Sequence, residues 1–151
     1  LSRGLGDVYK RQIETCLRDG ASADKELPSA DRILCDVPCS GLGVLSRKPE
    51  ICYKDDLIDT DLADIQYKIL CESAKYLKKG GKLVYSTCTL NPQENNKNTA
   101  KFLAEHNDFE GVELELPPEL KRAFDEKPYE ITLMPHTFDG DGFYIAVLTR
   151  R

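Results

Sequence analysis

Two short apolar segments separated by a helical pattern constrain the fold of this chain more than any other feature. Residues 32–37 (RILCDV) form a compact apolar run that stops at Pro38, which is typical of a strand buried on both faces of a parallel sheet. Residues 82–87 (KLVYST) predict a second strand. Between these strands, apolar side chains recur on one face of a predicted helix, which ends at Lys-Lys-Gly-Gly. The apolar side chains are Leu62, Ile65, Ile69 and Leu77.

The remaining segments extend this strand–helix–strand unit. Residues 13–18 (IETCLR) predict a short strand, and a second helix is expected to start at Asn91, with Glu94 in a capping-box position. Residues 130–134 and 143–149 predict two strands that are close in sequence. The order indicates an α/β sheet that ends in an antiparallel hairpin.

Composition limits the class of protein. The chain has 151 residues, a formal net charge of −5 and 40% hydrophobic residues, which fits one globular domain. No apolar run approaches the roughly 20 residues that span a bilayer. The six cysteines contain no C-x-x-C spacing, which disfavours a zinc site or a redox pair, so we expect reduced thiols, a cytoplasmic location and a monomer.

Two cysteines directly follow predicted strands. Cys39 lies in the segment 36–41 (DVPCSG) and Cys88 in the segment 86–89 (STCT). Ligands of open α/β sheets bind at the carboxyl ends of the strands, so both thiols are expected at one edge of the sheet. A thiol there acts as a nucleophile if its pKa is lowered, and two buried core cysteines are the alternative. Cys35, inside the first apolar run, is expected in the core.

Two motifs around these cysteines are similar to a known family. Residues 36–50 (DVPCSGLGVLSRKPE) and 83–95 (LVYSTCTLNPQEN) resemble motifs of the RNA cytosine-C5 methyltransferases of the Sun/Nop type, in particular bacterial members that modify 16S ribosomal RNA. The similarity continues through residues 61–79 and 134–151. It implies part of a Rossmann-like class I methyltransferase fold, with a mostly parallel sheet, S-adenosylmethionine as cofactor and small-subunit ribosomal RNA as partner.

The resemblance also implies roles for individual residues. Cys88 matches the nucleophile that attacks C6 of the target cytosine, and Cys39 matches the second cysteine, which assists release of the methylated RNA. Asp36 matches a catalytic carboxyl at the junction of cofactor and base, where it also contacts the cofactor. Asp19 matches an acidic residue that contacts the adenosyl group. The resemblance implies no metal.

The family pattern is only partly present in this chain. The glycine-rich cofactor loop and the acidic residue after the next strand have no counterpart, so we expect residues 13–151 to be the C-terminal portion of the catalytic domain. Residues 1–12 are expected to be an unmatched leader that is not native to it. We therefore expect the chain to be inactive alone and to leave an apolar sheet edge at residues 33–35.

Two other interpretations stay open at this point. A DNA cytosine-C5 methyltransferase would use the Pro-Cys cysteine, Cys39, as its nucleophile. A non-catalytic RNA-binding fragment would fit the missing cofactor loop. For the RNA methyltransferase that the resemblance implies, residues 40–56 form a loop that is expected to supply part of the wall of a base pocket. Arg47 and Lys48 either contact phosphate or base there or are solvated loop cations.

Overall fold

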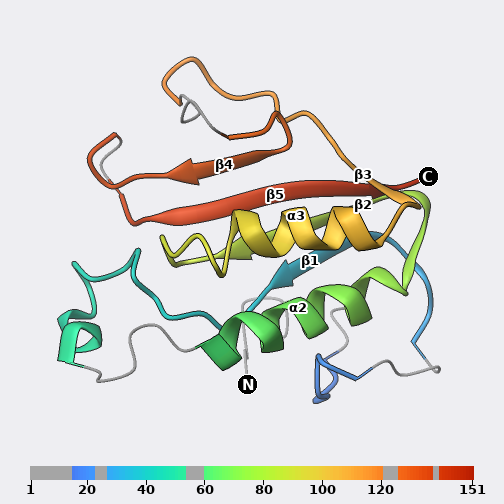
Figure 1. The fold of residues 1–151 in the computed structure, drawn as a ribbon, viewed down its shortest axis with the longest axis horizontal. Coiled ribbons are helices and arrows are strands. Elements are labelled where there is room, and N and C mark those ends of the chain that lie inside the picture. Colours follow the sequence, from blue (N-terminus) through green and yellow to red (C-terminus); the bar gives the residue numbers. More distant parts are fainter. Residues whose placement is uncertain (1–14, 23–26, 54–59, 121–125, 138–139) are drawn as a thin grey trace, which may run out of the picture.

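A mixed sheet with two helices on one face makes up the described part of the chain (Figure 1). The computed structural model describes residues 15–22, 27–53, 60–120, 126–137 and 140–151. The strands are β1 (Ala30–Asp36), β2 (Leu77–Thr87), β3 (Phe109–Gly111), β4 (Glu130–Leu133) and β5 (Phe143–Arg150). The helices are α2 (Thr60–Ala74), α3 (Asn96–Glu105) and the short 3-10 helix η1 (Pro49–Tyr53).

The pairing of β1 with β2 confirms the predicted strand–helix–strand unit. The two strands are parallel, with Arg32 opposite Lys82 and Asp36 opposite Ser86, and α2 is the crossover between them. A parallel pair requires such a crossover, since its strands cannot be joined by a tight turn. Both strands therefore end at the same edge of the sheet.

The expectation of a mostly parallel sheet is wrong for the described strands. The order is β1-β2-β5-β3, with β4 also paired to β5, and only β1–β2 is parallel within this set. The cause is the short connection from β4 to β5, which favours antiparallel pairing and gives the predicted hairpin. Because β5 then pairs with β2 on its other side, the antiparallel arrangement extends into the middle of the sheet.

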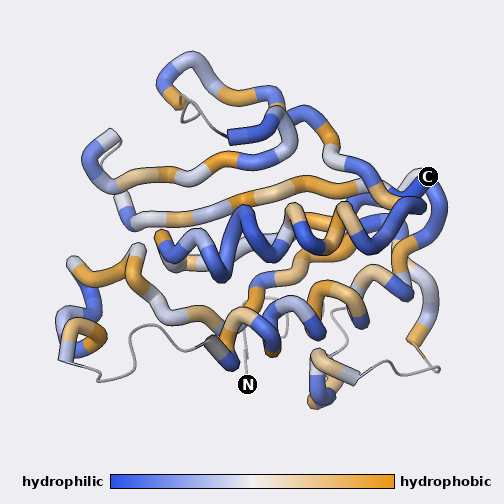
Figure 2. Tube along the Cα trace, viewed as in Figure 1, coloured by the Kyte–Doolittle hydropathy of each residue, from blue (hydrophilic) through white to orange (hydrophobic). Residues whose placement is uncertain are grey.

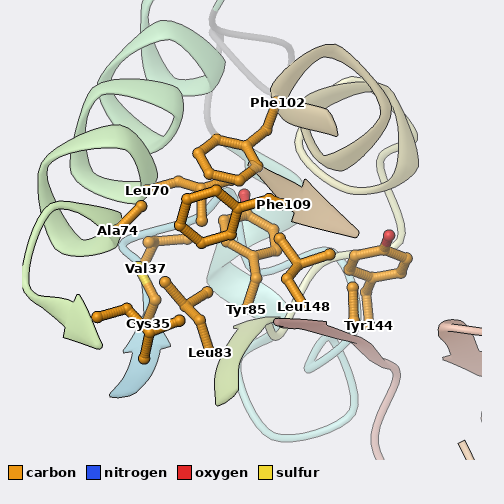
Figure 3. Packing of buried hydrophobic residues seen from close by; sticks show 12 residues of the cluster. Cys35, Val37, Leu70, Ala74, Leu83, Tyr85, Phe102, Phe109, Tyr144 and Leu148 are labelled. Carbon is orange, nitrogen blue, oxygen red and sulfur yellow. The ribbon is translucent and has the colours of Figure 1, made fainter. Parts of the chain in front are cut away.

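One face of the sheet packs against both helices and forms the core. Alternate residues of β2 and β5 point to this face, where Leu83, Tyr85 and Leu148 are fully buried. Leu70 from α2 and Phe102 from α3 close over them, and Figure 3 shows these side chains converging between helices and sheet. Figure 2 shows the corresponding hydrophobic stretches along β2 and β5.

The buried face of helix α2 overlaps only in part with the face that its pattern indicates, since Ile69 packs against the core and Ile65 does not. Its buried side chains are Gln66, Leu70 and Ala74, spaced four residues apart, whereas Ile65 is 43% exposed. The helix ends at Ala74, and the Lys-Lys-Gly-Gly segment lies within β2, where the register with β1 shifts. Gly80 has a φ of 73°, a left-handed conformation that glycine adopts without strain.

Other predicted elements are displaced. Of the strand expected at 13–18, residues 15–18 are irregular and exposed, and the first two positions lie outside the described residues. A short strand that the sequence pattern does not predict, Phe109–Gly111, follows α3. Helix α3 begins at Asn96, since residues 92–95 form turns. No helix among the described residues is long and apolar enough to cross a membrane.

The outer edge of β1 exposes apolar surface, as expected for residues 33–35. Among the described strands β1 pairs only with β2, and Leu34 is 70% exposed on the face opposite the helices, whereas Cys35 is buried. An apolar strand edge with unpaired backbone groups is a template for association with another chain.

Replacing Leu34 with Lys is therefore expected to reduce self-association of this chain without lowering its stability. A charged side chain at an exposed edge opposes edge-to-edge pairing and removes no packed contact. Static light scattering over a concentration series measures the effect. Leu83→Ala is the contrasting variant, because deleting a fully buried side chain costs about 2–5 kcal/mol of unfolding free energy. Unchanged association of Leu34→Lys would contradict the role assigned to this edge.

Candidate functional site

The two cysteines that follow β1 and β2 are in contact. The Sγ atoms of Cys39 and Cys88 lie 3.1 Å apart, both thiols are free, and both residues are half-buried. Parallel pairing brings the strand ends together, and the Val37 N–H donates to the Ser86 carbonyl at 3.3 Å to extend the ladder towards the thiols. The structure thus joins residues that are far apart in the sequence into one pair.

Burial changes the pKa of the Cys39 thiol. Burial, followed by the hydrogen bond with Cys88, raises the pKa of Cys39 from 9.0 to about 12. Cys39 therefore keeps its proton at neutral pH. Either sulfur of the pair can donate the hydrogen bond to the other.

Asp36 lies next to this pair at the end of β1. Its carboxylate accepts a hydrogen bond from the Ser86 hydroxyl at 3.1 Å, and its side chain is otherwise exposed. Asp36 and Ser86 face each other across the β1–β2 pair on the side opposite the helices. A carboxylate held in this way remains free to accept further hydrogen bonds from a ligand at the strand ends.

Asp19 lies in a different place. It lines a pocket of about 330 Å³ together with Ile33 and Tyr76, whereas the cysteines and Asp36 do not line this pocket. The Asp19 carboxylate accepts a hydrogen bond from the backbone N–H of Ala21 at 3.0 Å. The structure therefore does not bring Asp19 together with Asp36, and a shared role for them in cofactor binding stays a prediction.

A second cavity adjoins the Cys88 loop. It has a volume of about 640 Å³ and is lined by Leu42, Gly43, Leu45, Ser46, Arg47, Leu90, Pro135, Gly140 and Asp141. The Gly43 N–H donates to the Cys88 carbonyl at 2.9 Å, and the Gly142 N–H donates to the Gly43 carbonyl at 2.7 Å. The two backbones approach so closely that a Cβ at Gly43 would lie 2.1 Å from the Gly142 oxygen. Both positions thus require glycine.

One wall of this cavity carries an ion pair. The guanidinium of Arg47 lies 3.0 Å from the carboxylate of Asp141, which also accepts a hydrogen bond from the Ser46 hydroxyl at 3.2 Å. The Arg47 side chain is 75% exposed, so its remaining donors face solvent. It is therefore positioned at the mouth of a mainly apolar cavity beside the cysteine pair.

The pattern-based reading missed two buried polar residues behind the cysteines. Glu94 was predicted to cap a helix, but its carboxylate accepts hydrogen bonds from Ser40, Gln66 and Asn91 instead. Gln66 is fully buried although it lies within an otherwise amphipathic helix. Gln66 lies four residues before Leu70 and therefore on the same face of the helix. That spacing is the feature of the sequence that indicates its burial.

The other cysteines do not join the pair. Cys35 is buried in the core as expected, and its thiol contacts the Ser73 hydroxyl at 3.7 Å. Cys16 and Cys52 are exposed, and Cys71 is half-buried in α2. Within the described residues, no group of three or more His, Cys, Asp or Glu side chains is arranged to hold a metal ion.

Comparisons with known proteins identify relatives of this chain. Residues 4–149 match the family described as 16S rRNA methyltransferase RsmB/F. The probable ribosomal RNA small subunit methyltransferase B of Bacillus subtilis is 43% identical over 80% of this chain and 28% of its own length. The ribosomal RNA small subunit methyltransferase B of Yersinia enterocolitica is 40% identical over 100% of this chain and 34% of its own length. The chain thus spans about a third or less of these relatives.

Solved structures agree with the sequence comparisons. The crystal structure of PH0851 superimposes with a TM-score of 0.84 at 29% identity, covering 97% of this chain and 34% of that protein. NSun6 from Pyrococcus horikoshii, solved with the S-adenosylmethionine analogue SFG, gives a TM-score of 0.68 at 31% identity. This match covers 82% of the chain and 30% of NSun6. The family match begins at residue 4, and residues 1–14 lie outside the described residues, so the predicted boundary after residue 12 stays a prediction.

The raised pKa of Cys39 predicts an order of thiol alkylation. At pH 8, iodoacetamide is expected to modify the exposed Cys16 and Cys52 first and Cys39 much more slowly, because only the thiolate reacts. The rate at Cys39 should rise with pH until the pH approaches about 12, the raised pKa of its thiol. Peptide mapping by mass spectrometry gives the rates, with the urea-unfolded chain as control. Equal rates for Cys39 and Cys16 at pH 8 in the folded chain would contradict this environment.

Proposed function

This chain belongs to the RsmB/F family of 16S rRNA methyltransferases, and we propose that its paired cysteines perform transfer of a methyl group to C5 of a cytosine in small-subunit ribosomal RNA. The observation that carries the proposal is the 3.1 Å contact between the thiols of Cys39 and Cys88 at the ends of two parallel strands. The family depends on S-adenosylmethionine, which supplies an electrophilic methyl group when it is bound.

Cys88 is proposed as the nucleophile. Its thiol loses its proton to a base from solvent, its Sγ forms a bond to C6 of the cytosine, and the electron pair of the C5–C6 double bond shifts onto the ring. C5 thereby becomes carbanion-like and would take the methyl group, whose bond to the sulfur of bound S-adenosylmethionine would break. Covalent addition of this kind divides one difficult step into two easier ones. The place of Cys88 directly after β2, with the Cys39 sulfur 3.1 Å from its own, supports this assignment.

Cys39 is proposed to assist release. After methylation, a base from solvent takes the proton from C5, and the electron pair of that C–H bond re-forms the C5–C6 double bond and expels Sγ of Cys88. A thiol at 3.1 Å is close enough to return a proton to the departing sulfur. The two cysteines therefore divide attack and release between them.

Asp36 is proposed to hold the cytosine ring. Its carboxyl lies at the end of β1, where it accepts one hydrogen bond from Ser86 and leaves oxygen lone pairs for the base or the reacting end of the cofactor. Asp36 would hold this reacting end of S-adenosylmethionine, whereas Asp19 lines a separate pocket. The assignment of Asp19 to the adenosyl group remains a proposal, as does the partial class I methyltransferase fold.

The cavity beside Cys88 is proposed to face the RNA. Its apolar lining suits an unstacked base, and the exposed Arg47 guanidinium at its mouth suits a phosphate. We place the enzyme in the cytoplasm as a monomer that acts on ribosomal RNA. The formal charge of −5 for this chain favours local contacts of this kind over a broad basic surface.

Cysteine substitutions test the division of roles. In an active enzyme that contains this sequence, Cys88→Ala is expected to abolish methylation, whereas Cys39→Ala is expected to accumulate a covalent protein–RNA adduct. Denaturing gel electrophoresis with labelled RNA measures the adduct. Cys52→Ala is the matched control, because this exposed thiol lies in η1 away from the pair.

The same experiment separates the proposal from its main alternative. The double variant Cys39→Ala with Cys88→Ala should form no adduct, since the attacking sulfur is gone. A nucleophile at Cys39, as in the DNA-type reading, would give the adduct in Cys88→Ala and none in Cys39→Ala. Either that result or the absence of adduct in Cys39→Ala would overturn the assigned roles.

The 151-residue chain alone is expected to bind S-adenosylmethionine weakly. The glycine-rich cofactor loop of the family and the acidic residue after its next strand have no counterpart in this sequence, so the chain offers only part of a site. Isothermal titration calorimetry is expected to give no measurable heat at micromolar ligand, with the longer Bacillus subtilis relative as comparison. Micromolar affinity for the chain alone would contradict this expectation.

A further inference from the structure

A fully buried carboxylate lies directly behind the cysteine pair. Glu94 is 1% exposed and belongs to the turn between β2 and α3. One carboxylate oxygen accepts from the Ser40 hydroxyl at 2.6 Å and the Asn91 amide at 3.0 Å. The other accepts from the Ser40 backbone N–H at 2.9 Å and the Gln66 amide at 2.7 Å. A buried charge is tolerated only with such a set of donors.

These donors come from the segments that carry the two cysteines. Ser40 directly follows Cys39, and its backbone and side chain both donate to Glu94. Gln66, from α2, also donates to the Pro38 carbonyl at 2.8 Å, so it holds the residue on the other side of Cys39. The Cys39 loop is therefore fixed to Glu94 on both sides of its thiol.

The Cys88 loop is attached to the same carboxylate. Because the single hydroxyl proton of Ser40 is donated to Glu94, the hydroxyl of Thr89 is the donor in the 2.7 Å contact between Ser40 and Thr89. Thr89 directly follows Cys88, and its hydroxyl in turn accepts from the Asn91 N–H at 3.2 Å. Glu94 thus connects the residue after one cysteine to the residue after the other.

We propose that Glu94 is a positioning residue that holds the thiols of Cys39 and Cys88 at their working separation by joining the loop after β1 to the loop after β2. It acts through Ser40 and Gln66 and does not touch either sulfur. Glu94 joins the two loops whatever reaction the thiols perform. Its role in catalysis rests on the proposed function.

The negative charge of Glu94 is essential to this arrangement. Four N–H or O–H donors converge on two oxygens, which matches the lone pairs of a carboxylate. A glutamine of the same shape replaces one acceptor oxygen with an NH2 group that faces donors. Glu94→Gln therefore leaves buried donors unpaired and loosens the two loops, although it preserves volume.

A matched control exists in the same chain. Glu130, in β4, is also buried, at 3% exposed, and accepts from the Tyr144 hydroxyl at 2.6 Å and the Lys127 N–H at 3.2 Å. Its carboxylate also accepts from the Thr99 hydroxyl of α3 at 3.5 Å, and none of these three partners belongs to the segments that carry the cysteines. Glu130→Gln therefore reports the general cost of neutralising a buried carboxylate.

The test measures how readily the two thiols meet, and needs neither RNA nor cofactor. Diamide takes two hydrogen atoms from the thiols of Cys39 and Cys88, which leaves a disulfide and converts the diazene to a hydrazine. The chain carries Cys16→Ser and Cys52→Ser to remove the exposed competitors. Peptide mapping gives the rate of cross-link formation at a temperature where all variants are folded by circular dichroism.

Glu94→Gln is expected to slow this cross-link about tenfold, and Glu130→Gln to change it less than about twofold. Ser40→Ala removes only one hydroxyl and serves as the milder variant if Glu94→Gln does not fold; it is expected to slow the cross-link about threefold. Equal rates in the Glu94 and Glu130 variants, or an unchanged rate in Ser40→Ala, would overturn the proposal.

Kinetics of an active enzyme that contains this sequence provide the second readout. Glu94→Gln is expected to lower kcat while leaving KM for RNA nearly unchanged, since Glu94 aligns the thiols and lies away from the RNA cavity. A change confined to KM would contradict positioning. A slowed cross-link together with no methyltransferase activity in the unsubstituted enzyme would refute the proposed function and leave the positioning role standing.

Discussion

The parallel pairing of β1 and β2 is the constraint on which the site depends. It makes two strands end at the same edge, and it requires the α2 crossover that supplies Gln66 to the network behind the thiols. The apolar alternation of β2 and β5 buries one face against α2 and α3 and keeps that edge rigid. Cys39 and Cys88 each lie within three residues of the end of β1 or β2, so short loops are enough to place both thiols at this edge.

Among the described residues, the acidic and basic side chains that are buried are Glu94 and Glu130. Each of these carboxylates lies at a place where a loop must be held against the sheet, and each is surrounded by donors. The cysteine pair lies between the first of these networks and the cavity lined by Arg47. The polar interior therefore orients the thiols, while the exposed cation faces outward towards a ligand.

Residue patterns predicted the strands β1, β2, β4 and β5 and the shared edge of Cys39 and Cys88, because these follow from apolar runs and from the geometry of parallel pairs. They predicted the buried face of α2 only in part, since Gln66 is buried to serve distant partners. They also misread Glu94, because its spacing from Asn91 fits a local capping box equally well. Whether its carboxylate turns to its own helix or to Ser40 depends on a loop far away in the sequence.

The position of β5 has a consequence for how the site assembles. Among the described strands it is the last in sequence, yet it pairs with β2, β3 and β4, and Gly142 at its start bonds to Gly43 in the loop after Cys39. Pairings between distant segments form late, after the cost of closing long loops is met. During synthesis the Gly43 backbone therefore meets Gly142 only after the start of β5 has emerged, whereas the β1–β2 pair and the partners of Glu94 all precede it in the sequence.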